Sequence, residues 1–411
     1  MKRVVVTGCG VVSPVGIGKT SFWDSLVCGK SGVGPLTAFD VSAFDSQIAG
    51  EVLDFIPPSF LSSKDLRRAP RFVQLVLKAA EEALEDSGIK DHLDDPYRIG
   101  TIIGSGIGSL GTVEEEHLVF LNKGPKRISP FLIPMLITNE AAGWVAIRFG
   151  LKGINFCPVT ACASGAHAIG EAFEAIKLGK ADAIVCGGSE SSLTPLGVGG
   201  FCALKALCKR NDEPTRASRP FDKERSGFVM AEGAGVVVLE EYEHAKARGA
   251  HIYVEMGGYG ATCDAYHITA PDPEGQAASR AIQFAMEDAG VEPQAGVYVN
   301  AHGTSTFLND KMETNAIKNA FGKYAYDINV SSTKSMTGHT LGAAGAIEYI
   351  VCCLAVKNKI IPPTINYENP DPECDLNYTP NKAIEADLKI ALSNSLGFGG
   401  HNATLLIKEF K

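Results

Sequence analysis

Cys162 stands where a predicted strand gives way to a predicted helix. An apolar run leads up to Thr160, and after the cysteine apolar residues recur at helical spacing, at Ala168, Ile169, Ala172, Phe173 and Ile176. A helix N-terminus favours a thiolate, so we expect it to lower the pKa of the Cys162 thiol. The small residues around Cys162 also leave room for an extended substrate. The stretch therefore predicts a nucleophile, the alternative being a buried structural cysteine.

Two histidines further along the chain are expected to converge on Cys162. His302 lies in Asn300-Ala-His-Gly-Thr-Ser-Thr306, just past a predicted strand, and His339 ends Lys334-Ser-Met-Thr-Gly-His339, before a helix rich in glycine and alanine. Gly397-Phe-Gly-Gly400 is a turn whose N–H groups are able to bind an oxyanion, or alternatively a simple hairpin turn.

Composition narrows the class of protein. The chain has 411 residues, 45% of them hydrophobic, and a net charge of -9, which argues against general nucleic-acid binding. The longest apolar helix, about 341–356, contains Glu348, and we expect no membrane insertion and a cytoplasmic location. Eleven cysteines without a C-x-x-C pair favour neither a zinc site nor a disulfide framework.

The order of predicted elements occurs twice along the chain. Strand 4–7 with a glycine turn from Gly8 corresponds to strand 252–256 with Gly257 to Gly260, and the Cys162 strand and helix correspond to strand 330–333 with helix 341–356. Gly8 and Gly10 only faintly resemble a dinucleotide fingerprint, because the third glycine of that motif and a following acidic residue are missing. We predict a duplicated α/β fold with halves 1–250 and 251–411, and chemistry where they meet.

These motifs together resemble the elongating β-ketoacyl-[acyl carrier protein] synthases, a branch of the thiolase-like condensing enzymes. The resemblance covers essentially the whole chain, and includes segments 160–164, 220–222, 227–233, 300–306, 334–339 and 394–400. A histidine at position 339 matches the elongating branch, whereas thiolases have cysteine there and chain-initiating synthases have asparagine. The resemblance implies two similar mixed-sheet halves with helices layered between and outside them.

The implied reaction is a decarboxylating Claisen condensation of malonyl-acyl carrier protein with an acyl-enzyme thioester in fatty-acid elongation. The alternative is a ketosynthase of a dissociated polyketide pathway. Cys162 would carry the acyl group, the N–H groups of Cys162 and Phe398 would hold the oxyanion, and neutral His302 and His339 would donate hydrogen bonds to the enolate. Lys334 would keep those histidines neutral, held by Asp310 and Glu313.

The resemblance also implies binding roles. Thr304 and Thr306 would bind the phosphopantetheine arm brought by the carrier protein, while Ile107, Phe201, Phe398 and Gly399 would line or gate the acyl pocket. No cofactor is required; a structural Na⁺ or K⁺ ion is expected at Asn300, Glu348, Ser393 and Asn394, where a hydrogen-bond cluster fits equally well. Carrier-protein docking is expected at a basic patch of Lys64, Arg67, Arg68, Arg127 and Lys205, with Lys126 nearby.

Two further expectations concern assembly and rival functions. Relatives form homodimers across a central strand, which the resemblance places at 156–159. Non-catalytic partners of polyketide synthases share the fold but lack the nucleophile, so the presence of Cys162, His302 and His339 argues against that class. A cysteine hydrolase is disfavoured because no separate Cys-His-Asn signature occurs.

Overall fold

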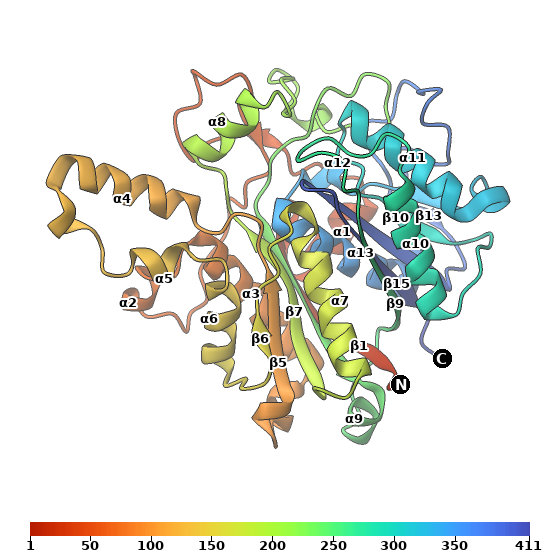
Figure 1. Ribbon diagram of the computed structural model, residues 1–411, viewed down its shortest axis with the longest axis horizontal. Helices are drawn as coiled ribbons and strands as arrows, with labels where there is room; N and C mark the ends of the chain where they lie inside the picture. The colour runs from red at the N-terminus through yellow and green to blue at the C-terminus, as the bar shows by residue number, and fades with distance from the viewer.

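One mixed sheet runs through the computed structural model, which describes all 411 residues (Figure 1). Its strand order is β11-β10-β14-β15-β9-β1-β8-β7-β5-β6, with β2 (Gly16–Ile17) paired to β1 as the eleventh strand. The first half supplies β1 (Val4–Ser13), β8 (Gly233–Glu241), β7 (Ala183–Glu190), β5 (Ile99–Gly104) and β6 (Asn155–Phe156). The second half supplies β9 (Val254–Cys263), β15 (His401–Lys408), β14 (Ile390–Gly397), β10 (Tyr298–Asn300) and β11 (Asn329–Ser331).

The two halves have the same strand order and the same strand directions. In each, two antiparallel pairings (β1–β8–β7 and β9–β15–β14) lead to two parallel ones (β7–β5–β6 and β14–β10–β11). The predicted duplication is therefore confirmed. The halves do not form separate sheets, because β1 and β9 pair antiparallel and join them edge to edge.

Helices cover both faces of this sheet. Helices α7 (Ser164–Lys177) and α13 (Ala344–Asn358) pack against each other at the centre of the largest core cluster, and α13 is buried from Ala344 to Val356. Helices α3 (Arg71–Ser87) and α6 (Glu140–Phe149) cover the opposite face of the first half. Helices α10 (Gln276–Ala289) and α11 (Phe307–Phe321) cover the second half.

The remaining elements are short or peripheral. The helices are α1 (Lys19–Val27), α2 (Ser63–Leu66), α4 (Leu110–Lys123), α5 (Leu132–Leu136), α8 (Pro195–Ala203), α9 (Tyr242–Ala247) and α12 (Lys334–Thr337). Two small ladders pair β3 (Gly34–Pro35) with β4 (Ile48–Ala49) and β12 (Ile360–Ile361) with β13 (Ile384–Glu385).

The turn predicted from Gly8 is wrong, since β1 continues to Ser13. A Cβ atom on Gly10 would lie 2.0 Å from the Ala79 carbonyl oxygen of α3, so glycine is needed for close packing of helix on strand. The second half repeats the device: a Cβ atom on Gly260 of β9 would lie 2.0 Å from the Ala281 carbonyl oxygen of α10. These glycines therefore hold helices against the sheet rather than bind a nucleotide.

The strand before Cys162 is shorter than expected, and the longest apolar helix is buried in the core. The strand predicted to be buried before Cys162 is only Asn155–Phe156, at the exposed edge of the sheet. Leu341–Asn358 is long and apolar enough to cross a membrane by length and composition, but 89% of this segment is buried inside the protein, as in a core helix.

We predict that Gly10→Ala lowers the free energy of unfolding by about 1–3 kcal/mol, because the added methyl group meets helix backbone that cannot rotate away. Gly34→Ala is the matched control, since nothing lies within 4 Å of the position of its added Cβ atom. Urea unfolding of both variants measures the difference. Equal midpoints for the two variants would contradict the packing role.

Candidate active site

Cys162 lies in a strained turn at the start of α7. The 3₁₀ turn η4 (Ala161–Ala163) precedes α7, and Ala161 has a φ of 50°, which is rare for a residue with a side chain. The Ser164 hydroxyl stabilises this turn by donating to the Ala161 carbonyl oxygen (2.7 Å) and accepting from the Thr160 N–H (2.9 Å). Strain held in this way is typical of functional turns.

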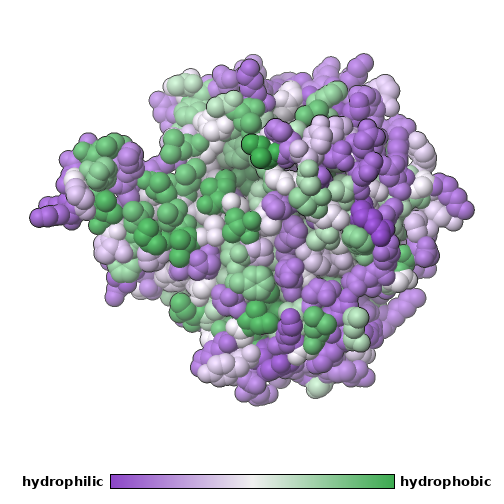
Figure 2. Space-filling model, viewed as in Figure 1, coloured by the Kyte–Doolittle hydropathy of each residue, from purple (hydrophilic) through white to green (hydrophobic).

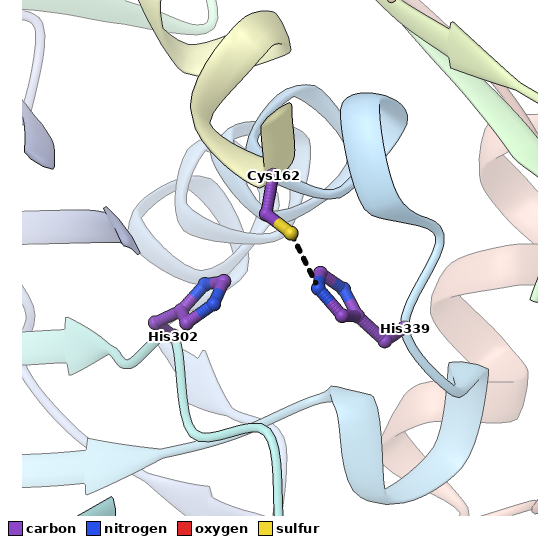
Figure 3. Close-up of side chains that lie close together, drawn as sticks. All are labelled: Cys162, His302 and His339. Atoms are coloured by element: carbon purple, nitrogen blue, oxygen red, sulfur yellow. Dashed lines mark hydrogen bonds between the residues drawn. The ribbon is translucent and has the colours of Figure 1, made fainter. Parts of the chain in front are cut away.

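The two histidines flank the sulfur (Figure 3). His339 Nε2 lies 3.0 Å from Cys162 Sγ, and the rings of His302 and His339 are nearly perpendicular, with centroids 5.3 Å apart. The sulfur and one nitrogen from each histidine all lie within 4.8 Å of one another. The structure thus brings together the three residues that the sequence singled out.

Both histidines are neutral. Burial lowers the pKa of His302 and His339 well below the usual value, and the positive charge of Lys334 lowers both further. Lys334 Nζ lies 3.4 Å from His302 Nδ1 and has only protons to offer, so Nδ1 accepts and Nε2 carries the ring proton. His302 is therefore held as an Nε2–H donor.

The partner expected for Lys334 needs correction. Its Nζ pairs with Glu348 of α13, and both side chains are buried. Asp310 instead accepts from the Phe221 N–H (2.8 Å), and Glu313 accepts from the N–H groups of His302 and Gly303 (2.8 Å each). Asp310 and Glu313 therefore shape the loops beside the histidines but do not hold the lysine.

The expected low pKa of the thiol is also wrong. Cys162 keeps some exposure through the cavity, yet burial raises its pKa to about 12, while the charge of Lys334 acts in the opposite direction. Loss of solvation outweighs the field of the helix terminus here. Cys162 therefore holds its proton in the free protein and has to lose it during attack.

A cavity of about 430 Å³ opens onto the three residues. Its wall includes Thr304, Thr306, Phe201, Phe398 and Lys205, and the two threonine hydroxyl oxygens lie 2.9 Å apart. Ile107 is not in this wall but packs in the apolar cluster that contains Cys162 and Phe201. Gly399 is also outside the wall, and its N–H donates to the Ile268 carbonyl oxygen (2.8 Å), so it is not free for a substrate.

Comparison with known proteins decides the family. The model of the beta-ketoacyl synthase N-terminal domain matches residues 1–245, and that of the C-terminal domain matches residues 253–368. The chain belongs to the beta-ketoacyl synthase family. It is 51% identical to a 3-oxoacyl-[acyl-carrier-protein] synthase 2 of Synechocystis over 100% of this chain and 99% of that protein. It is 49% identical, with the same coverage, to a protein of that name from Staphylococcus aureus.

Solved structures agree with this assignment. A beta-ketoacyl synthase from Burkholderia phymatum superposes with a TM-score of 0.93 at 36% identity, covering all of both chains. A type II PKS complex of an acyl-carrier protein and its ketosynthase matches with a TM-score of 0.92 at 40% identity, also over all of both chains. The protein thus has the duplicated, thiolase-like fold of ketosynthases.

Glu190 was missed by sequence reasoning. This buried carboxylate, at the end of β7, accepts from the N–H groups of Gly106 (2.7 Å), Ile107 (3.2 Å) and Gly342 (3.3 Å), and burial raises its pKa to about 7. It joins the loop that carries Ile107 to the turn that follows His339. The signal in the sequence was weak: a single acidic residue that follows an apolar predicted strand.

Three buried side-chain acceptors, on β10, α13 and β14, have no partner. They are Asn300 Oδ1, Glu348 Oε2 and Ser393 Oγ, all buried. Asn300 and Ser393 face each other on neighbouring strands β10 and β14. Oxygen atoms of this kind fit a hard monovalent cation. The Asn394 side chain does not fit this role, because its hydrogen bonds are already made. Its Nδ2 donates to Glu313 (3.3 Å), and its Oδ1 accepts from the Thr404 hydroxyl (2.9 Å).

The five basic residues expected to form one docking patch lie in two places. Lys205 follows α8 at the cavity, whereas Lys64, Arg67 and Arg68 lie in or after α2, and Arg127 ends the 3₁₀ turn after α4. The Arg68 guanidinium stacks 3.8 Å over the ring of Phe131, next to α5. Figure 1 shows α2, α5 and the far end of α4 well separated from α8, although the first turns of α4 contact α8, where the Leu196 N–H donates to Glu114 Oε1 (3.1 Å). Within a single chain, the five basic residues therefore do not form one continuous patch.

We predict that the rate of Cys162 alkylation by iodoacetamide rises about tenfold per pH unit between about pH 7 and about pH 9, because only the thiolate reacts. Mass spectrometry of the Cys162 peptide measures the rate, with the exposed Cys263 as an internal comparison. A plateau already reached near neutral pH would mean that the helix terminus outweighs burial after all.

Proposed function

We propose that this protein elongates fatty acids by condensing malonyl-acyl carrier protein with an acyl group held on Cys162, giving 3-oxoacyl-acyl carrier protein. The observation that carries the proposal is a partly buried thiol beside two neutral histidines at the head of an apolar cavity. The relatives named 3-oxoacyl-[acyl-carrier-protein] synthase 2, at 49–51% identity, support the fatty-acid substrate class.

In the first half-reaction, Cys162 Sγ attacks the acyl thioester carbonyl carbon. The thiol proton leaves to solvent, and His339 Nε2–H, with Nε2 3.0 Å from Sγ, donates a hydrogen bond to the thiolate as it forms. The N–H groups of Cys162 and Phe398 make no backbone hydrogen bonds, so both are free to stabilise the oxyanion. The phosphopantetheine thiolate then leaves and takes a proton from solvent, so His339 stays neutral and keeps its Nε2–H.

In the second half-reaction, malonyl-carrier protein loses CO₂ and leaves an enolate. The enolate oxygen accepts hydrogen bonds from Nε2–H of His302 and His339, a role that requires both rings to be neutral. The enolate carbon attacks the acyl-Cys162 thioester, the tetrahedral intermediate collapses, and Cys162 leaves as a thiolate that takes up a proton from solvent. The product is two carbons longer.

This division of labour predicts different half-reaction losses for the two histidines. His302 makes no hydrogen bond to Cys162, so His302→Ala should leave acyl transfer nearly unchanged and slow decarboxylation on the order of 10²-fold to 10³-fold. His339→Ala should slow both steps. Radiolabelled acyl and malonyl substrates, followed separately, measure the two rates. Normal decarboxylation by His302→Ala would overturn the assignment.

The competing candidate is a ketosynthase of a dissociated polyketide pathway, favoured by the type II PKS ketosynthase at 40% identity. The two functions differ in the product formed from malonyl- and acyl-carrier protein without a reductase. A fatty-acid enzyme releases the product of one condensation, whereas a polyketide enzyme extends it repeatedly. Mass spectrometry of the carrier-bound products, over a ladder of acyl lengths, distinguishes them.

We also propose that no cofactor takes part and that a Na⁺ or K⁺ ion binds beside the active site. Asn300, Glu348 and Ser393 would hold it through their unpartnered oxygens. Such an ion would offset the charge of Glu348, leaving Lys334 freer to act on the histidines. A cytoplasmic location belongs to the same proposal, in keeping with the net charge of -9 and the reaction's carrier-bound substrates.

The proposed partner is an acyl carrier protein, and Lys205 is its first contact at the cavity. Lys205→Glu should raise KM about fivefold for carrier-bound substrates, because one exposed ion pair contributes up to about 1 kcal/mol. Small pantetheine thioesters should be unaffected, and added salt should shrink the loss. Lys389→Glu, an exposed lysine at the far end of β14, is the control. Equal losses on both substrate types would contradict docking at Lys205.

We propose that the protein is a homodimer paired along β6. This strand bonds only to β5 and leaves one edge open, and large apolar side chains around it are exposed: Ile133 60%, Ile147 79%, Phe156 40% and Val159 53%. Figure 2 shows apolar residues gathered on this side of the molecule, over α4, α5 and α6. An apolar surface of this kind beside an open strand edge supports a pairing site.

We therefore predict that Phe156→Lys shifts the dimer toward monomer. Tyr326→Lys is the control, because Tyr326 is 59% exposed but lies near β11 at the other end of the sheet. Light scattering at matched concentrations measures the mass. A fully active parent protein of 43.5 kDa in solution would refute the dimer.

A further inference from the structure

We propose that Cys162, His302 and His339 also bind one soft divalent cation, of which Zn²⁺ is the type, and that its binding blocks the reaction. This inference goes beyond the proposed function. It depends on the positions of the three side chains and not on which acyl group the protein uses.

The three ligand atoms are already close to metal-binding geometry. They lie within 4.8 Å of one another, and the Cys162 Sγ to His339 Nε2 distance is 3.0 Å. Tetrahedral zinc, with Zn–S about 2.3 Å and Zn–N about 2.0–2.1 Å, places its ligand atoms about 3.3–3.6 Å apart. Small side-chain rotations therefore suffice. One thiolate and two imidazoles select zinc and similar metals over Mg²⁺ or Ca²⁺.

The surroundings leave room for a fourth ligand. All three residues line the same cavity, so the metal would face water or a substrate oxygen on that side. Protein loops from both halves supply the ligands: η4 holds Cys162, the segment after β10 holds His302, and the segment after α12 holds His339. Because these loops lie far apart in sequence, no C-x-x-C spacing announces the site.

The free energy of Zn²⁺ binding depends on the charges already present at the site. Zn²⁺ displaces the Cys162 proton, which leaves to solvent, and no electron is transferred. Ligation through His302 Nε2 moves the ring proton to Nδ1 and ends the 3.4 Å contact with Lys334 Nζ. Lys334 keeps its pair with Glu348, so the nearby positive charge stays compensated, and both histidines are already neutral. Zn²⁺ with one thiolate leaves a net charge of +1 among the ligands, which the three metal–ligand bonds have to offset.

The test uses the full-length parent enzyme without substrate. Zinc sulfate is titrated against iodoacetamide labelling of Cys162, read by peptide mass spectrometry, with the exposed Cys263 as internal control. At a free Zn²⁺ concentration about 100 times the Kd, Cys162 labelling should fall about 100-fold while Cys263 labelling continues. EDTA should restore both Cys162 labelling and condensation. Unchanged Cys162 labelling at saturating zinc overturns the proposal.

Cobalt provides a second readout that does not depend on activity. One equivalent of Co²⁺ should give a thiolate-to-cobalt charge-transfer band and the strong d–d absorption of tetrahedral cobalt. Cys162→Ser should abolish the charge-transfer band. His302→Ala and His339→Ala should each weaken binding by at least the 10- to 100-fold typical of losing an outer-shell partner. Inhibition by zinc with no charge-transfer band, or with equal binding by Cys162→Ser, would place the metal elsewhere and refute the site.

Discussion

The buried ion pair between Lys334 and Glu348 is the interaction on which the active site depends. Both side chains are buried, so neither charge could remain without the other at a tolerable cost. Burial raises the pKa of Glu348 to about 7, and the charge of Lys334 opposes that shift. With its charge held in place, Lys334 reaches His302 and acts on His339 and Cys162 as well. The helix α13 is thus a core helix that also fixes the electrostatics of the site.

The duplication explains why only one half carries a nucleophile. The turn η7 (Leu341–Ala343) before α13 repeats η4, and Leu341 has a φ of 48° where Ala161 has 50°. Gly342 therefore occupies the position that corresponds to Cys162. A Cβ atom there would lie 2.4 Å from the Gly106 nitrogen and 2.7 Å from Glu190 Oε2. The second turn is packed against the first half, so it supports the site and leaves no room for a reactive side chain.

Sequence patterns revealed what depends on local spacing and motif. Cys162, His302 and His339 each lie in a short segment at the end of a strand or the start of a helix, and the repeated element order gave the duplicated fold. Contacts that depend on packing could not be predicted from the sequence. Lys334 pairs with Glu348, which the motifs had suggested only as a cation ligand, because the partner lies on a different helix. The Gly8 to Gly10 stretch was predicted to be a turn because glycine is typical of turns. The sequence alone does not distinguish a turn glycine from a strand glycine that lets a helix pack closely.

Burial and charge act differently on the two half-reactions. Burial keeps His302 and His339 neutral, as the enolate step requires, but it raises the pKa of Cys162, which hinders the acyl-transfer step. A positive charge favours the neutral form of a histidine and the ionised form of a thiol. Lys334 lowers the pKa of all three groups and so assists both steps at once. Burial thus favours the enolate step and disfavours the acyl-transfer step. The charge of Lys334, held in place by buried Glu348, favours both, and this allows one site to perform the two reactions.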